Sequence, residues 1–348
     1  MKVSLSHALF FSISILLLSC SSDASLIEKA EVYKEEKQKG AHIFGHDDTL
    51  NVAFCAKNNF DWITLTDWAY QKTIHSGSIV NYSADSSRIE ESNAAWLARV
   101  NWMQSEGFDI FIKPHLWIYK TENNQWRSEI FPKDEEAWQI WKEDYRKYIL
   151  RYAKIAEESG AEMFCIGTEL TRLTLEKPDY WKKLIEEVRD IYSGKLTYAA
   201  NWYREFEEIT FWDQLDYIGV QAYFPLADKN NPSIEDLENA WEQYTPTLGH
   251  LSDSLNKKVI FTELGYRSVS HTASMPWEWV EEREDDSVFS DEAQANCYQA
   301  FFTQVWPQDW FAGVHIWQVK QMHLNKGENL DFYLDGKKAE QIVSKAFE

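Results

Sequence analysis

Two glutamates stand at the ends of short apolar runs, which is an unusual place for a carboxylate. Residues 164–169 read Phe-Cys-Ile-Gly-Thr-Glu and residues 259–263 read Val-Ile-Phe-Thr-Glu. Burying an isolated carboxylate is costly, and a protein core gives no reason to do so twice. Two carboxylates that face each other across a cleft can hydrolyse an acetal, because one protonates the departing oxygen while the other meets the developing positive charge. The alternative for Glu169 and Glu263 is a place at the rim, where each would cap the next helix or pair with an arginine.

The elements that must position these glutamates follow a regular alternation. Short apolar runs alternate with longer amphipathic stretches, which is typical of βα units around a parallel sheet. The chain contains eight strand candidates, namely 41–44, 62–66, 110–118, 163–170, 196–201, 217–223, 259–264 and 314–319. Eight units in roughly 300 residues predict an α/β fold, a single-domain (β/α)₈ TIM barrel over residues 40–348. The competing architecture is an open doubly wound sheet, but no G-x-G-x-x-G pattern follows the first strand.

The barrel would bring the two glutamates together. Side chains at the carboxyl ends of the strands line the active site of such barrels. Glu169 ends the fourth strand and Glu263 the seventh, on roughly opposite sides of the mouth. We therefore expect both carboxylates to face one cavity.

Glycines and one serine mark the expected helix boundaries. Helices are predicted over 94–106, 135–159 and 180–193, and they are followed by Gly107, Gly160 and Gly194, each placed for a C-terminal cap. Ser233 stands three residues before Asp236, the spacing of a capping box, and should open a helix after the sixth strand. Trp96, Trp102, Trp138 and Trp141 recur at helical spacing, which predicts core positions.

The N-terminus has the features of an export signal. A lysine at position 2 precedes an apolar run over residues 8–18, which is too short to span a bilayer. The sequence Leu-Leu-Ser-Cys at 17–20 resembles the bacterial lipobox, which implies a lipoprotein signal peptide over 1–19 and acylation of Cys20. Residues 20–39 would form a tether or surface helix. The protein would then be periplasmic or at the cell surface and held to the membrane only by its lipid; an ordinary signal peptide is the alternative.

Composition excludes some partners. The net charge of -21, without a block of basic residues, argues against nucleic acid. No cluster has the spacing of metal ligands, since His115, His315 and His323 come from scattered strand ends, so no metal or other cofactor is expected. We expect Cys55, Cys165 and Cys297 to be buried thiols, and one disulfide among them stays open.

Four segments carry a family resemblance. They are Ile-Lys-Pro-His-Leu-Trp at 112–117, Cys-Ile-Gly-Thr-Glu-Leu at 165–170, Asp-Tyr-Ile-Gly-Val-Gln-Ala-Tyr-Phe-Pro-Leu at 216–226 and Phe-Thr-Glu-Leu-Gly-Tyr-Arg-Ser at 261–268. In this order they resemble glycoside hydrolase family 113, over about 40–332. The resemblance implies a retaining enzyme of the (β/α)₈ clan that acts mainly on β-1,4-mannans, without a cofactor, and we expect a monomer.

The same resemblance implies roles for individual residues. Glu169 would be the acid/base and Glu263 the nucleophile. Tyr223 would hydrogen-bond the nucleophile and keep it ionised, and Trp317 would be the platform under the sugar at the point of cleavage. A core position is the alternative for both aromatic residues.

Other residues are candidates for contacts with the substrate. Many relatives in the clan have an asparagine before the acid/base, where this chain has Thr168, so another residue must hold the sugar 2-hydroxyl; Asn201 and His115 are the candidates. Further substrate contacts are predicted for Trp68, Trp117, Arg267 and Trp277. Trp277 and Trp279 lie in the long loop over 268–290, and loops at this face of a barrel commonly shape the binding site.

Two rival functions remain at this level. One is a retaining β-glycosidase that acts on another β-linked glycan, because nothing in the strands distinguishes an axial from an equatorial 2-hydroxyl. The other is a glycan-binding lipoprotein that keeps the barrel without the chemistry, against which the presence of both glutamates argues.

Overall fold

The computed structural model describes residues 37–44, 48–81, 88–121, 125–278, 288–320 and 329–348. Residues 36–348 form one compact unit, and the described residues all belong to it. The predicted signal peptide, Cys20, nearly all of the tether, Trp279 and His323 lie outside the described residues. Within the described ranges, no helix combines the length and the apolar character needed to cross a membrane.

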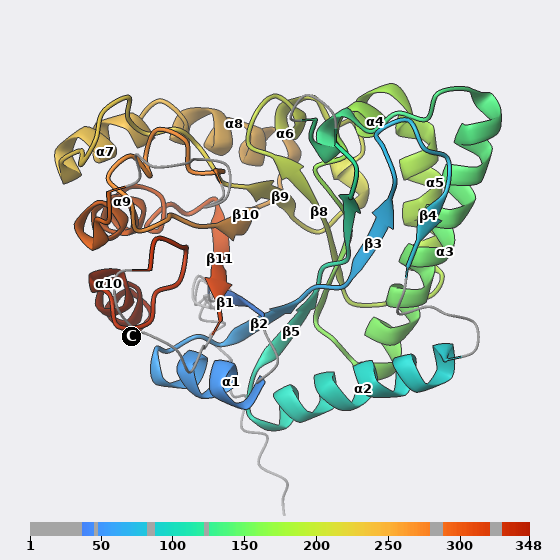
Figure 1. Ribbon diagram of the computed structural model, residues 1–348, viewed down its shortest axis with the longest axis horizontal. Coiled ribbons are helices and arrows are strands. Elements are labelled where there is room, and N and C mark those ends of the chain that lie inside the picture. Colours follow the sequence, from blue (N-terminus) through green and yellow to red (C-terminus); the bar gives the residue numbers. More distant parts are fainter. Residues whose placement is uncertain (1–36, 45–47, 82–87, 122–124, 279–287, 321–328) are drawn as a thin grey trace, which may run out of the picture. The chain divides into compact units, whose positions relative to one another are not determined.

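Eight parallel strands close into a barrel, which confirms the predicted fold (Figure 1). Around the barrel they follow the order β1-β11-β10-β9-β8-β7-β5-β2, so sequence neighbours are also spatial neighbours throughout. The strands are β1 (Gln38–Ile43), β2 (Trp62–Leu65), β5 (Asp109–Ile112), β7 (Met163–Thr168), β8 (Lys195–Asn201), β9 (Ile218–Gln221), β10 (Val259–Leu264) and β11 (Phe311–Val319).

Of the predicted strands only 259–264 has the observed bounds at both ends, and two of the differences are informative. The first strand begins at Gln38, inside the segment that we expected to be a tether. The predicted strand over 110–118 is two strands, because Pro114 has no N–H and interrupts the hydrogen-bonded ladder. After β5 the chain enters β6 (His115–Ile118), which pairs with β3 (Trp68–Gln71) in a separate small sheet that β4 (Ile79–Val80) completes.

The helices surround the barrel in Figure 1. They are α1 (Asp48–Lys57), α2 (Ile89–Ser105), α3 (Glu135–Ser159), α4 (Thr171–Glu176), α5 (Pro178–Arg189), α6 (Glu205–Glu208), α7 (Ile234–Trp241), α8 (Thr245–Leu255), α9 (Asp291–Gln304) and α10 (Lys338–Ala346). In α5 the buried residues Trp181, Leu184, Ile185 and Val188 recur at helical spacing, so one face of the helix packs against the barrel.

The predicted caps are mostly confirmed. The backbone of Gly160 is left-handed (φ 68°) where α3 ends, and Ser233 forms a capping box with Asp236 at the start of α7. The prediction for Gly194 was wrong, because α5 ends earlier, at Arg189. A Cβ at Gly194 would lie 2.2 Å from the hydroxyl oxygen of Tyr192, so the close approach of that ring explains the glycine.

Core predictions for cysteine and tryptophan agree with the structure. Cys55, Cys165 and Cys297 are free, buried thiols. Trp96, Trp138 and Trp141 are buried, and Trp102 packs half-buried against the core. Trp141 and Tyr145 stack face to face between α3 and the barrel, with ring centroids 4.7 Å apart.

Candidate active site

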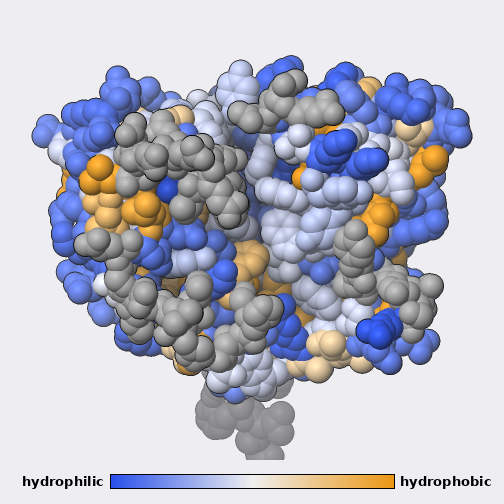
Figure 2. Space-filling view, viewed as in Figure 1, coloured by the Kyte–Doolittle hydropathy of each residue, from blue (hydrophilic) through white to orange (hydrophobic). Residues whose placement is uncertain are grey.

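Both glutamates face one cavity of about 680 Å³ at the carboxyl ends of the strands. The face drawn in Figure 2 is hollowed near its centre, over the barrel strands of Figure 1. The lining residues are Trp68, Trp117, Trp126, Arg127, Glu169, Asn201, Trp202, Tyr203, Tyr223, Glu263, Trp277, Glu278, Trp317 and Phe332. In the part of the chain that the structure describes, no three His, Cys, Asp or Glu side chains gather as they would around a metal ion.

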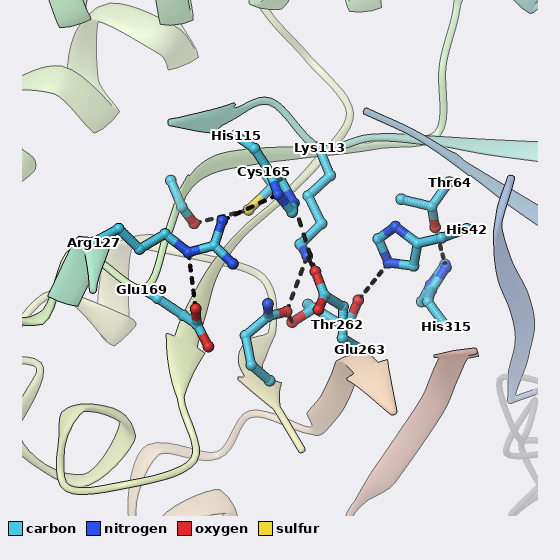
Figure 3. A network of polar contacts seen from close by, with 12 residues as sticks. His42, Thr64, Lys113, His115, Arg127, Cys165, Glu169, Thr262, Glu263 and His315 are labelled. Carbon is cyan, nitrogen blue, oxygen red and sulfur yellow. Dashed lines mark hydrogen bonds and ion pairs between the residues drawn. The ribbon is translucent and has the colours of Figure 1, made fainter. Parts of the chain in front are cut away.

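Glu263, in β10, is held by a buried cation and a phenol. The ammonium group of Lys113 donates a short hydrogen bond to Oε1, and the Tyr223 hydroxyl donates to Oε2 at 2.8 Å. Lys113 also donates to Oε1 of Gln221 at 2.9 Å. Lys113 is fully buried and Glu263 is 2% exposed, so solvent screens this ion pair very little. Figure 3 shows the pair within a larger polar network.

These contacts keep Glu263 ionised. Burial raises the pKa of a carboxyl group, but the charge of Lys113, with smaller contributions that include the charge of Arg127 and the Lys113 hydrogen bond, outweighs it, and the pKa of Glu263 is about 2. The neighbouring His115 stays neutral, because burial and the charges of Lys113 and Arg127 hold its pKa well below 6.5. Since Arg127 donates to Nδ1 of His115 at 3.2 Å, the ring proton is on Nε2, 3.5 Å from Oε1 of Glu263.

Glu169 follows β7 and has different partners. Arg127 donates from Nε at 2.8 Å and the Trp126 indole N–H donates at 2.9 Å, both to Oε2. The expected alternative, a pairing with an arginine, is therefore present, yet the same side chain also lines the cavity. The backbone of Glu169 is left-handed (φ 51°), which costs a residue with a Cβ roughly 1–2 kcal/mol. Such strain concentrates at functional sites, where the surrounding fold holds it.

Aromatic rings cover two walls of the cavity. On one, Trp117 contacts both Trp68 and Trp126 edge to face, with centroids 5.6 and 5.1 Å away. On the other, Trp202 and Trp277 stack with centroids 5.4 Å apart. Flat rings of this kind fit the apolar CH faces of sugars.

Trp317, at the end of β11, completes the lining. It clusters with Tyr223 and Phe332, and its ring packs against Phe44 and His42 at centroid distances of 4.9 and 5.0 Å. The ring is only 4% exposed, so it can offer one face to a ligand at most.

Eight of the ten residues predicted for catalysis or substrate contact line the cavity, and two do not. His115 is fully buried behind the wall, 4.7 Å from the Trp68 ring. Arg267 is 2% exposed and donates from Nε to the carbonyl of Leu330 at 3.2 Å. Because both side chains are covered, they support the wall, and the predicted sugar contacts of His115 and Arg267 do not fit this structure.

The cavity and its polar network also contain residues that the sequence analysis did not single out. Lys113 directly follows the apolar strand β5, and the rule that selected the two glutamates applies to it as well. Trp126 and Arg127 lie at the start of the short 3₁₀ helix η2 (Arg127–Glu129), after the small sheet, and no periodic pattern marks them. Trp202 and Glu278 follow β8 and β10 in loops that only the fold brings to the cavity.

A parallel barrel with paired carboxylates and aromatic walls at its mouth defines the class of this protein, a glycoside hydrolase. The chain belongs to Glycoside Hydrolase Family 113, whose sequence model matches residues 45–337. This confirms the family inferred from the four sequence segments. A search of curated proteins gave no match.

Solved structures of the same family share the fold. The structure of a complex of a GH113 β-1,4-mannanase has 24% sequence identity to this chain, with a TM-score of 0.76 over 90% of this chain and 99% of the other. A GH113 β-mannanase from Alicyclobacillus acidocaldarius in complex with ManMIm has the same identity and TM-score, over 90% and 97%. A β-glucuronidase from Faecalibacterium prausnitzii is 13% identical, with a TM-score of 0.58 over 90% of this chain and 49% of the other.

Proposed function

We propose that this glycosidase is an endo-acting, retaining enzyme that cleaves β-1,4-mannosidic bonds. One observation carries the proposal: two carboxylates, one directly after β7 and one in β10, face one cavity and have different hydrogen-bonding partners. Glu263 is held ionised by Lys113, as a nucleophile requires, whereas the contacts of Glu169 fall on Oε2. Oε1 of Glu169 is then the oxygen that exchanges a proton with the substrate.

The reaction begins with attack on the anomeric carbon. An oxygen of Glu263 forms a bond to this carbon while the glycosidic C–O bond breaks, and the proton of Glu169 goes to the departing oxygen. Glu263 loses its negative charge on becoming an ester, and the hydrogen bond from Tyr223 steadies the carboxyl group throughout.

Water completes the turnover. Glu169, now ionised, takes a proton from a water molecule whose oxygen attacks the anomeric carbon, and the bond to Glu263 breaks. Both residues return to their starting protonation states. Two inversions at the same carbon leave the anomeric configuration of the substrate unchanged.

Membership in family 113 and the likeness to β-1,4-mannanases support the choice of mannan, since the solved relatives carry that name. Thr168 stands where many relatives in the clan have the asparagine that binds the sugar 2-hydroxyl. Among the predicted contacts that line the cavity, Asn201 is the candidate to bind this hydroxyl instead. Trp68, Trp117, Trp277 and Trp317 supply stacking surfaces for the flanking sugars.

Product analysis tests the substrate. Purified protein without residues 1–19 should release mannobiose and longer fragments from the interior of β-1,4-mannan, with little product from cellulose oligomers, as chromatography of the digests would show. If the protein cleaves cellulose oligomers in preference to mannan, mannan is not its substrate. Inertness toward mannan, glucomannan and cellulose would favour the glycan-binding rival.

We further propose that Cys20 anchors the protein to a bacterial membrane, in the periplasm or at the cell surface. The sequence Leu-Leu-Ser-Cys supports this, and an acyl chain contributes about 0.8 kcal/mol of membrane binding for each buried CH₂. After labelling of growing cells with an alkyne fatty acid, the wild type should carry label and sediment with membranes, and Cys20→Ser should do neither. Labelled Cys20→Ser would contradict the anchor, and Cys55→Ser serves as the control.

A further inference from the structure

Glu205 is a buried carboxylate that the proposed reaction does not use. It is the first residue of α6, just beyond the end of β8, and its side chain is fully buried. Its oxygens accept four hydrogen bonds: Oε1 from Tyr198 and Thr174, each at 2.8 Å, and Oε2 from Thr171 at 3.0 Å and the backbone N–H of Asn201 at 2.7 Å. Burial raises the pKa of Glu205 to about 7, and these four donors oppose that rise.

The donors belong to the two segments that shape the acid/base side of the cavity. Thr171 and Thr174 lie in α4, which begins two residues after Glu169. The Tyr198 hydroxyl, besides donating to Glu205, accepts from the backbone N–H of Leu170 at 2.7 Å. The turn after Glu169 is therefore tied to Glu205 at residues 170, 171 and 174, and Asn201 is tied to the same carboxylate.

This turn needs such support. Glu169 has the left-handed backbone described above, and its N–H donates to the carbonyl of Ala199 in β8 at 2.9 Å. The strand before it packs closely against Tyr198, since a Cβ at Gly167 would lie 2.8 Å from Cε2 of that ring. A left-handed residue persists only where its surroundings fix it.

We propose that Glu205 is a positioning residue that sets the place of the Glu169 carboxyl group for proton transfer to the departing sugar. The inference rests on the proposed function, in which Glu169 is the acid. Four donors from two segments, α4 and β8, converge on one carboxylate, so its loss moves the turn that carries Glu169. Glu263 is held by Lys113 and Tyr223, which follow β5 and β9, and stays in place.

The dependence of the rate on the leaving group tests this role. A 2,4-dinitrophenyl group departs without a proton, whereas a sugar requires one. For Glu205→Gln we expect kcat/KM on a β-linked oligosaccharide to fall about 10- to 100-fold, the cost of a small misplacement of a catalytic group. On the dinitrophenyl glycoside of the released sugar, kcat/KM should stay within about threefold of wild type. Tyr198→Phe, which cuts the link to Leu170 but keeps the carboxylate, should give the same pattern.

Two reference variants make the outcome decisive. Glu340→Gln removes a buried carboxylate that binds Lys57, Asn58 and the backbone N–H of Gly336 and does not line the cavity. It should leave kcat/KM on both substrates unchanged. Equal losses on both substrates for Glu205→Gln and Tyr198→Phe, or no loss, would overturn the positioning role. Glu169→Ala should show the largest selective loss; if it shows none, the proposed acid is wrong, whatever Glu205 does.

Discussion

Glu263→Gln is expected to lower kcat about 10⁴-fold or more, the scale on which enzymes lose activity when a nucleophile is removed. The amide has nearly the same shape as the carboxylate, so it still fits between Lys113 and Tyr223, but it cannot form the ester with the anomeric carbon. Substrate binding should remain, because the stacking surfaces and hydrogen-bonding groups of the cavity are unchanged. Steady-state kinetics on mannan oligomers, with calorimetric measurement of Kd, separate the two effects.

The matched control is another carboxylate of the same cavity. Glu278 lines the wall beside Trp277 and is given no part in the proposed reaction, so Glu278→Gln should retain more than about a tenth of wild-type kcat. A Glu263→Gln enzyme that keeps a tenth of its activity would remove Glu263 from the role of nucleophile. Circular dichroism melting curves would show that both variants are folded.

Lys113→Met is expected to move the acidic limb of the pH profile of kcat/KM to higher pH. In the wild type the pKa of Glu263 is about 2, so this carboxylate is ionised across the ordinary pH range. Without Lys113 the largest lowering influence is gone while burial remains, and the pKa should rise above 4.5. A pKa about 2 units above 4.5 leaves about 1% of Glu263 ionised at pH 4.5 but most of it ionised at pH 7, so we expect kcat/KM to fall about 100-fold at pH 4.5 and much less at neutral pH.

The free energy of unfolding of Lys113→Met should also depend on the raised pKa of Glu263. Removing one partner of a buried ion pair costs about 3–5 kcal/mol, because the other charge is left uncompensated. A raised pKa of Glu263 means that the folded variant binds a proton that the unfolded chain has lost, so its stability should fall as pH rises through the interval between 4.5 and the new pKa. Urea unfolding at several pH values measures this.

A second buried lysine provides the control for Lys113→Met. Lys337 donates to the hydroxyl of Ser268 and the carbonyl of Asp331, outside the cavity lining. Lys337→Met should lower stability and leave the acidic limb where it is. If Lys113→Met also leaves the limb unchanged, Lys113 does not set the ionisation of Glu263.

The sequence could predict the barrel and its two glutamates because both depend on local patterns. Apolar runs of strand length alternate with helical stretches, and a charged residue at the end of such a run is visible without a structure. Lys113 follows the same rule after β5, but the strand was extended through Pro114, which placed the lysine inside a strand. Given the break that proline imposes, the residue that holds the nucleophile could have been found.

Other parts of the site depend on tertiary structure alone. Arg127 and Trp126 reach Glu169 from a short 3₁₀ helix about forty residues earlier in the chain, and no spacing encodes that approach. His115 and Arg267 are residue types that can bind a sugar, but in this structure both side chains are buried behind the cavity lining. The sequence places a side chain near the mouth of a barrel, but whether it lines the wall or lies behind it depends on which neighbours cover it.

In the proposed mechanism Glu263 forms a covalent bond to the sugar. The direct measurement is peptide mass spectrometry of the protein after incubation with the 2-deoxy-2-fluoro glycosyl fluoride of the disaccharide released in product analysis, a reagent whose fluorine slows the second step. We expect one added glycosyl group, on the peptide that contains Glu263, and none in Glu263→Gln. A glycosyl group on any other residue, or turnover of the reagent to the inverted sugar with no adduct, would contradict this mechanism.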